Sequence, residues 1–164
     1  MTEIATPTTV INVAVIDDDA NVRNGLWWLL DHVVGLRCVG TYAGCREFLN
    51  SNATPPEVLL LDVSMPEMSG LEGIRPIKTQ YPSIKIIVHS NFEDEDKITH
   101  AQHDGAAGYV LKNASAPQLY DAILSVYRGD SVWPAGFEHE TSNSTRFSFL
   151  QALVHKVRTA VNLR

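Results

Sequence analysis

The chain has 164 residues, a net charge of −6, 45% hydrophobic residues and 20% charged residues. This balance is typical of one globular domain with short appendages, and it argues against a disordered chain and a general nucleic-acid binder. No apolar stretch is long enough to cross a membrane, residues 1–10 do not resemble a signal peptide, and the two cysteines cannot build a disulfide framework. We therefore expect a cytoplasmic protein.

Five short apolar runs alternate with amphipathic stretches along the chain. Runs of this length, rich in β-branched residues and bounded by polar residues or glycine, are typical of buried parallel strands. The expected strands are residues 11–16, 36–41, 58–61, 84–89 and 107–111. Because helical crossovers between parallel strands are right-handed, the pattern predicts an α/β fold with a doubly wound, five-stranded parallel sheet.

The stretches between these runs show helical spacing of apolar residues. The expected helices are residues 21–34, 43–50, 70–80, 94–103 and 115–128. Asp19 is expected to cap the first helix. Of the adjacent Trp27 and Trp28, we expect one ring to pack into the core and the other to be exposed. Pro76 falls inside the third helix, so we expect regular helix only to Arg75, followed by a kinked last turn.

The composition changes after Gly129. Residues 131–145 are rich in small and polar residues and predict a linker. Residues 146–164 carry apolar residues at steps of three and four, which predicts an amphipathic tail helix. We expect a disordered leader at 1–10, the main domain at 11–130, and a tail helix that either packs on its own domain or pairs with a second copy.

Polar residues follow the expected strands at their C-terminal ends. Asp17 and Asp18 follow the first strand, Asp62 the third, Ser90 the fourth and Lys112 the fifth. In a doubly wound sheet these ends face the same side, so we expect the five side chains to converge. Each residue alone has an ordinary interpretation as a helix cap, a turn residue or a solvated lysine. Their shared position at strand ends favours a functional site.

Three carboxylates close together repel one another unless a cation neutralises them. Mg²⁺ prefers oxygen ligands and is satisfied by one or two carboxylates with phosphate oxygens and water. Lys112 would supply a second positive charge, pairing with Asp62 at rest and with a phosphoryl oxygen later. Ser90 can donate a hydrogen bond to a phosphoryl oxygen. These are the parts needed to take a phosphoryl group in line.

Four blocks of this sequence resemble the receiver domain of bacterial two-component response regulators. They are VIDDD at 15–19, LLLDVSMPEMSG at 59–70, IVHS at 87–90 and GAAGYVLK at 105–112. The blocks occur in the family's order and with similar spacing over residues 11–129. The last block looks like the subclass usually joined to a LuxR-type helix-turn-helix domain. The resemblance implies a flavodoxin-like fold with a C-terminal helical extension.

The resemblance also implies a role for each matched residue. Asp62 matches the phosphoacceptor, with Lys112 and Ser90 as its catalytic partners. Mg²⁺ would be bound by Asp17, Asp18, Asp62 and the backbone carbonyl of Ser64.

Ser90 and Tyr109 match the switch pair, whose movement changes the face made by the fourth and fifth helices and the fifth strand. Asn113 follows Lys112 where many relatives have proline, which puts in doubt the cis peptide bond typical of that position.

The expected function is a phosphoacceptor receiver that takes a phosphoryl group from a sensor histidine kinase or phosphotransfer protein. It is not an enzyme beyond self-phosphorylation and self-dephosphorylation at Asp62. Its output would be protein–protein contact or dimerisation, through the tail helix or the fourth- and fifth-helix face, with no nucleic acid bound by this chain alone.

Two alternatives remain open. The chain could be a truncated LuxR-type transcriptional regulator. It could also be a haloacid-dehalogenase-like phosphatase, with Asp17 as nucleophile, Asp19 as acid/base, and Ser90 and Lys112 as the second and third motifs. That reading lacks a glycine after the acidic pair and leaves Asp62 unexplained.

Overall fold

The computed structural model describes residues 9–137, so residues 1–8 of the predicted leader and the whole predicted tail helix lie outside the described residues. Five parallel strands form one sheet in the order β2-β1-β3-β4-β5. Their bounds are β1 Ile11–Ile16, β2 Leu36–Tyr42, β3 Val58–Leu61, β4 Lys85–Ser90 and β5 Gly108–Leu111. The predicted doubly wound parallel sheet is confirmed, with strand ends shifted by no more than one residue.

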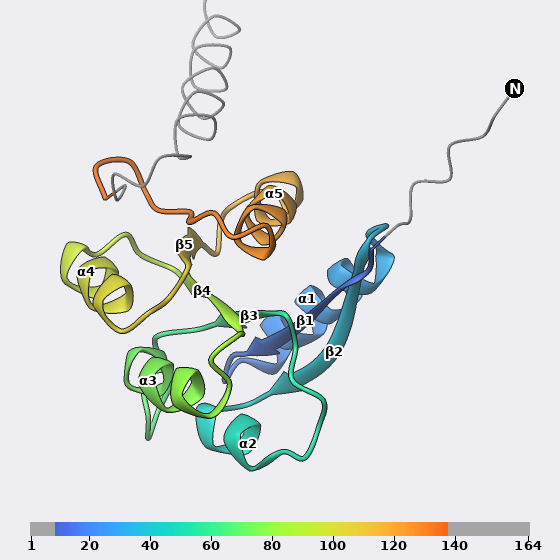
Figure 1. Ribbon diagram of the computed structural model, residues 1–164, viewed down its shortest axis with the longest axis horizontal. Helices are drawn as coiled ribbons and strands as arrows, with labels where there is room; N and C mark the ends of the chain where they lie inside the picture. Colours follow the sequence, from blue (N-terminus) through green and yellow to red (C-terminus); the bar gives the residue numbers. More distant parts are fainter. Residues whose placement is uncertain (1–8, 138–164) are drawn as a thin grey trace, which may run out of the picture.

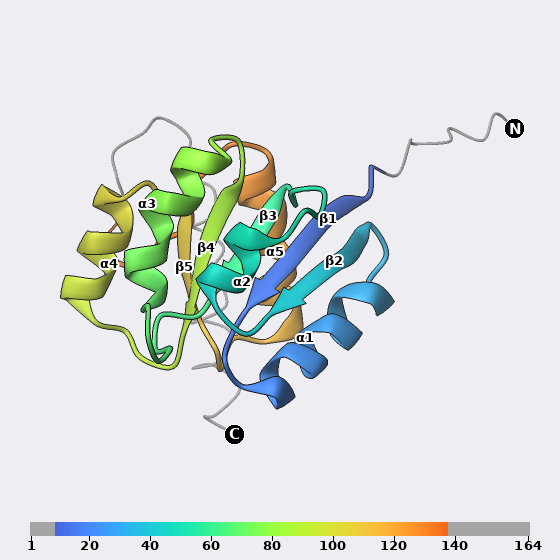
Figure 2. The ribbon, with the colours of Figure 1, turned by 90° about the horizontal axis from the view of Figure 1, so that it is seen from below.

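Five helices cover the two faces of the sheet (Figure 1). Their bounds are α1 Ala20–His32, α2 Cys45–Asn50, α3 Gly70–Gln80, α4 Glu95–His103 and α5 Ala116–Tyr127. Figure 2 shows α2, α3 and α4 together on one face, with α1 and α5 on the other. Within the described residues, no helix is long and apolar enough to span a membrane.

The central strand β3 shows why the sheet is covered on both faces. All four of its residues, Val58–Leu61, are fully buried. Leu59 and Leu61 join the apolar cluster under α2, α3 and α4, whereas Val58 and Leu60 join the cluster under α1 and α5. Burial of each such side chain stabilises the fold by roughly 1.5–3 kcal/mol before the loss of chain entropy.

The strand order reverses direction at β1, which lies between β2 and β3. Ile16 pairs with Leu61, and the amide of Asp62 donates to the carbonyl of Ile16 at 2.8 Å. The residues that follow β1 and β3 are therefore neighbours at the C-terminal edge of the sheet. This is the position where open α/β sheets place their ligands.

Helix α3 continues through Pro76 to Gln80, so the expected end of regular helix at Arg75 is wrong. Proline removes the amide that would bond to Glu72, but burial of the neighbouring helix face compensates for that loss. Ile77, one residue beyond the proline, is fully buried, and Thr79 Oγ1 donates to the carbonyl of Arg75 at 2.8 Å.

The expectation for the tryptophan pair is also wrong. Trp27 is 47% exposed and Trp28 is 58% exposed. Leu26 and Leu30 occupy the buried stripe of α1, so neither indole reaches the core. The ring of Trp28 instead stacks on His32, with 4.4 Å between ring centroids.

Candidate functional site

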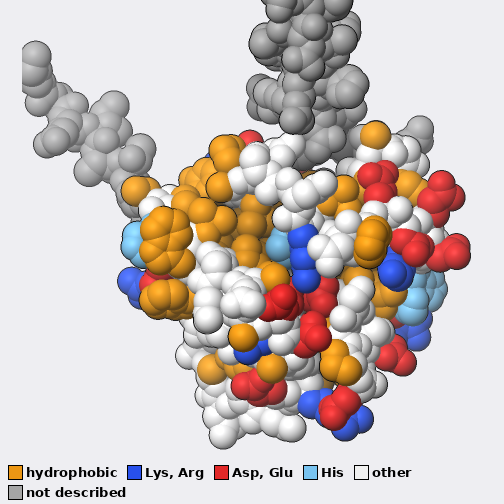
Figure 3. Space-filling model, turned by 180° about the vertical axis from the view of Figure 1, so that it is seen from behind, with side chains coloured by type: hydrophobic (Ala, Val, Ile, Leu, Met, Phe, Trp, Pro, Cys, Tyr) orange, Lys and Arg blue, Asp and Glu red, His pale blue; other side chains and the backbone are white. Residues whose placement is uncertain are grey.

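Asp17 and Asp62 lie side by side at the C-terminal ends of β1 and β3, and both are buried. Asp18 is exposed beside them. One oxygen from each of the three carboxylates lies within 4.8 Å of the others. In the space-filling view, acidic side chains gather beside a basic one near the middle of the face (Figure 3). The predicted convergence of the three aspartates is therefore observed.

Lys112 reaches the same place from the end of β5. Its Nζ lies 2.6 Å from Oδ2 of Asp17 and 3.1 Å from Oδ1 of Asp62. The expected pairing of Lys112 with Asp62 is present, but the closer contact is with Asp17. The other oxygen of Asp17 accepts the amide of Asp19 at 2.9 Å, so both oxygens of Asp17 have hydrogen-bond partners.

Burial dominates the electrostatics of Asp62. It raises the pKa of this carboxyl group, Asp17 and Asp18 raise it further, and Lys112 opposes the change. For Lys112, burial alone would lower the pKa of the ammonium, but the hydrogen bond to Asp17 and the negative charges of Asp17 and Asp62 outweigh it and raise that pKa. The ammonium therefore stays charged, while Asp62 lacks full compensation for its own charge.

One buried oxygen provides a direct test of whether this site fits a metal ion. Within the described part of the chain, Oδ1 of Asp62 is buried and has no hydrogen-bond partner, because Lys112 approaches it at ion-pair distance without hydrogen-bond alignment. A buried carboxylate oxygen without a hydrogen bond costs free energy that a cation can recover. Three clustered carboxylate oxygens are also the ligand type that Mg²⁺ prefers, so the donor set fits it.

The loop after Asp62 is fixed by its backbone. Gly70 begins α3 so close to the loop that a Cβ atom there would lie 1.9 Å from the carbonyl oxygen of Asp62. Only glycine permits this approach. Ser69 and Glu72 form a capping box that holds the start of α3. Ser64 is exposed in this loop, and a role for its carbonyl in metal binding stays a prediction.

Ser90 and Tyr109 are both buried and meet at the backbone of Phe92, between β4 and α4. The amide of Phe92 donates to Oγ of Ser90 at 3.3 Å, and the hydroxyl of Tyr109 donates to the carbonyl of Phe92 at 2.7 Å. Phe92 as a whole residue is 68% exposed. The two predicted switch residues are thus joined through one loop residue, and the Tyr109 ring faces inward.

Two residues near this site were not predicted from the sequence. Arg23 on α1 donates from Nη1 to the carbonyls of Asp17 at 2.7 Å and Asp18 at 3.0 Å. His89 lies buried on β4 immediately before Ser90, and burial followed by the charge of Lys112 lowers its pKa to about 4. The burial of His89 could have been predicted from the sequence, because residues two apart in a strand point to the same face and His89 lies two positions after the apolar Ile87. Arg23 had no comparable signal.

The bond after Lys112 is trans, as is every peptide bond among the described residues. This agrees with the doubt raised by Asn113 about a cis bond there. Asp19 caps α1 as predicted, accepting the amide of Asn21.

Comparison with known proteins places this geometry among signalling proteins. Residues 13–124 match the response regulator receiver domain. The transcriptional regulatory protein LnrK of Bacillus subtilis is 33% identical over 126 residues, and the oxygen regulatory protein NreC of Staphylococcus aureus is 37% identical over 123. These alignments cover 76% and 74% of this chain but 57% of each relative, so the chain spans little more than half their length.

Solved structures show the same fold. The isolated REC domain of RcsB from Salmonella enterica serovar Typhimurium, in the presence of phosphomimetic BeF₃⁻, matches with a TM-score of 0.67 and 26% identity, covering 77% of this chain and 94% of that one. A LuxR-family two-component response regulator from Aurantimonas sp. SI85-9A1 matches with a TM-score of 0.70 and 24% identity, covering 75% and 89%. The flavodoxin-like expectation is confirmed.

Proposed function

Because the chain belongs to the response regulator receiver domain family, we propose that Asp62 accepts a phosphoryl group from the phosphohistidine of a sensor histidine kinase or phosphotransfer protein. The single observation that best supports this choice of acceptor is the difference between two neighbouring carboxylates. Both oxygens of Asp17 accept hydrogen bonds, whereas Oδ1 of Asp62 accepts none.

In the proposed transfer, a carboxylate oxygen of Asp62 attacks the phosphorus atom. A bond from this oxygen to phosphorus forms while the phosphorus–nitrogen bond breaks, and the departing imidazole keeps that electron pair and takes up a proton. The ammonium of Lys112, 3.1 Å from Asp62, lies close enough to pair with a phosphoryl oxygen. The hydroxyl of Ser90 supplies a hydrogen bond to another.

Mg²⁺ is proposed as the cofactor, held by Asp17, Asp18, Asp62 and the carbonyl of Ser64. When bound, it offsets the negative charge of the carboxylates and of the phosphoryl oxygens. Lys112 alone cannot balance three carboxylates, which supports a requirement for a further cation.

The proposed output is a change in protein contacts. A phosphoryl oxygen that draws the Ser90 hydroxyl toward Asp62 would act on the Phe92 amide, which already bonds to Ser90, and so favour one position of Tyr109. Tyr109 lies on β5, between α4 and α5, so this face is proposed to bind a partner or a second copy. Members of this family act as regulators, and we propose no turnover of separate substrates.

The phosphatase alternative, with Asp17 as nucleophile, is not favoured. Asp17 is held by Lys112 and by the Asp19 amide, and the family match assigns the domain to receivers. The transcriptional-regulator alternative does not compete with this proposal, because the described residues form the receiver fold and the chain spans little more than half the length of LnrK and NreC.

The proposal is tested by exposure to acetyl phosphate with Mg²⁺, followed by intact-mass measurement and peptide mapping. The wild-type protein should gain one phosphoryl group on Asp62, Asp62→Asn should gain none, and omission of Mg²⁺ should suppress labelling. Asp121→Asn is the matched control, since it removes an exposed carboxylate on α5 outside the site, and it should be labelled like the wild-type protein. An unmodified wild-type protein, or a label on Asp17, would overturn the proposal.

A further inference from the structure

Residues 131–137, within the predicted linker, return to the domain after α5 and lie along the outer side of β5. We call this segment the edge strap. β5 is the edge strand of the sheet, which would otherwise leave backbone groups unpaired. The amide of Val132 donates to the carbonyl of Ala107 at 3.0 Å, and the amide of Tyr109 donates to the carbonyl of Val132 at 2.8 Å. The strap thus forms a parallel bridge with Gly108.

A glycine in β5 leaves room for the backbone of the strap. A Cβ atom on Gly108 would lie 2.9 Å from the carbonyl oxygen of Val132 and 3.4 Å from its Cβ. Gly108 therefore allows a backbone approach that any side chain would obstruct. Val132 and Trp133 are both buried, on opposite faces of the sheet, as successive residues of a strand would be.

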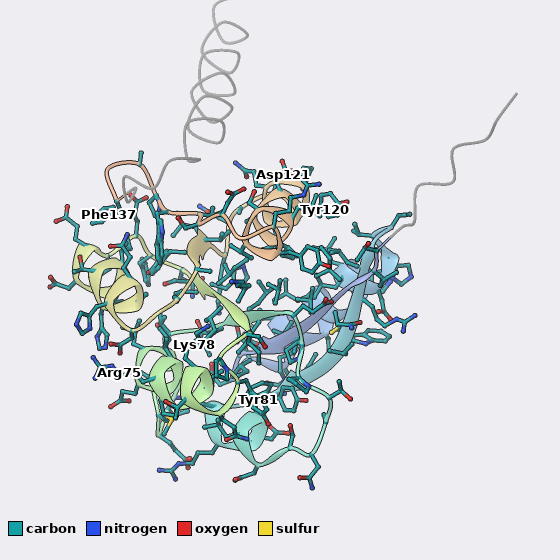
Figure 4. The ribbon with its side chains drawn as sticks, in the orientation of Figure 1. Arg75, Lys78, Tyr81, Tyr120, Asp121 and Phe137 are labelled. Atoms are coloured by element: carbon teal, nitrogen blue, oxygen red, sulfur yellow. The ribbon has the colours of Figure 1, made fainter. Side chains whose placement is uncertain are left out.

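The far end of the strap is attached to α4. Nε2 of Gln102 donates to the carbonyl of Phe137 at 2.6 Å. Phe137 packs against the cluster that also contains Trp133 and Tyr109, and Figure 4 shows it beside α4, where the described chain ends. The strap therefore connects the edge of β5 to α4 across the face that carries Tyr109.

Tyr109 belongs to the predicted switch pair and also contacts the strap. Its amide holds the carbonyl of Val132, and its hydroxyl holds the carbonyl of Phe92. Its ring shares a buried cluster with Trp133. Movement of this ring out of the cluster would remove packing from Trp133 and disturb the backbone that pairs with Val132.

The strap's attachment is incomplete in one respect. Nε1 of Trp133 is buried and has no hydrogen-bond acceptor among residues 9–137. A buried donor without a partner favours any state in which it can reach water. Solvation of this donor therefore favours detachment of the strap once the packing of Tyr109 is lost, so that the strap has two positions of similar free energy.

We propose that the edge strap is the element that reports the state of Asp62 to the chain beyond Phe137. It docks on β5 and α4 while Tyr109 is inward, and it detaches when Tyr109 leaves the cluster. Phosphorylation favours the docked position. A partner that binds the outer side of β5 must displace the strap. This inference rests on the proposed function, because Asp62 supplies the signal.

Amide hydrogen exchange tests the inference with an internal control. The amides of Tyr109 and Val132 donate the hydrogen bonds between β5 and the strap. The amide of Ala107 donates instead to the carbonyl of Ile86 on β4. Adding beryllofluoride with Mg²⁺ should slow exchange at Tyr109 and Val132 about tenfold more than at Ala107. In Tyr109→Leu this difference should disappear.

Gly108→Ala and Gln102→Ala should each speed exchange at Val132 while leaving phosphorylation of Asp62 by acetyl phosphate intact. Binding of beryllofluoride is monitored separately by its ¹⁹F signal. If that signal appears but exchange at Val132 is unchanged, or slows equally in Tyr109→Leu, the strap inference fails and the phosphoacceptor proposal stands. If neither beryllofluoride nor acetyl phosphate reacts at Asp62, the proposed function fails, and the inference fails with it.

Discussion

The ammonium of Lys112 lies 2.6 Å from the carboxylate of Asp17, and 14% of the Lys112 side chain and 1% of the Asp17 side chain are exposed. The pair therefore forms a nearly buried ionic contact between the two ends of the domain's sequence. Its removal leaves Asp17 and Asp62 as buried carboxylates with no basic partner within 4 Å among the described residues.

Lys112→Ala should lower the free energy of unfolding by about 3–5 kcal/mol at pH 7 without Mg²⁺, since breaking a buried pair strands the remaining charges. Added Mg²⁺ should recover part of this loss. Urea unfolding with and without Mg²⁺ measures both effects. Lys97→Ala is the control, because its pair with Asp94 is 3.8 Å long and partly exposed, and should cost under about 1 kcal/mol. Equal losses in the two variants would contradict this account of Lys112.

Asp62→Asn should abolish phosphorylation and at the same time stabilise the metal-free protein, by about 1 kcal/mol at pH 7. Burial raises the pKa of Asp62, so its charged form is disfavoured in the fold. The charge is a cost at pH values above the folded pKa, and the stability gain of the variant should shrink as the pH falls through that pKa. Thermal or urea unfolding of both proteins across pH gives the comparison; a variant less stable than wild type at pH 7 would refute the prediction.

His89 should make the protein sensitive to acid. Burial lowers the pKa of His89 from 6.5 to about 4, so the unfolded chain takes up a proton at higher pH than the folded chain. Stability is therefore lost as the pH falls below 6.5, and the loss reaches about 3 kcal/mol below pH 4. His89→Leu, measured by urea unfolding between pH 4 and pH 8, should lack this component. Parallel pH curves for the two proteins would show that His89 is not its source.

Arg23 should act as a positioning residue for the metal ligands. It holds the carbonyls of Asp17 and Asp18 without bonding to their carboxylates. Arg23→Gln should weaken Mg²⁺ binding about tenfold, a typical cost of losing a group that orients metal ligands. Calorimetric titration with Mg²⁺ and no phosphoryl donor measures this directly. Arg37→Gln, at an exposed position on β2, changes the net charge equally and should leave the Mg²⁺ affinity unchanged. An equal loss of Mg²⁺ affinity in Arg37→Gln would show that net charge, and not the position of Arg23, causes the effect.

The strands and most helix ends were predictable because their signals are local. The unbroken run of apolar residues in β3 and the polar residue that follows it are properties of consecutive residues. The Asp19 cap is equally local, since its side chain bonds two residues further on. The end of α3 at Pro76 and the burial of one tryptophan were predicted wrongly. Both predictions relied on the properties of single residues, whereas packing against the core decides where α3 ends and which side chains of α1 are buried. Burial of Ile77 holds α3 together past the proline, and two leucines already fill the inward stripe of α1.

The sequence by itself determined that carboxylates, a serine and a lysine follow the ends of parallel strands, because each apolar run and the polar residue that ends it are adjacent in the chain. Only the tertiary structure decided which of these groups contact each other. Lys112 is 95 residues from Asp17, and their 2.6 Å contact depends on the order in which the strands assemble. The same holds for the strap, whose Val132 accepts a hydrogen bond from the amide of Tyr109. These contacts join segments distant in sequence, and packing of the whole sheet against its helices sets their geometry.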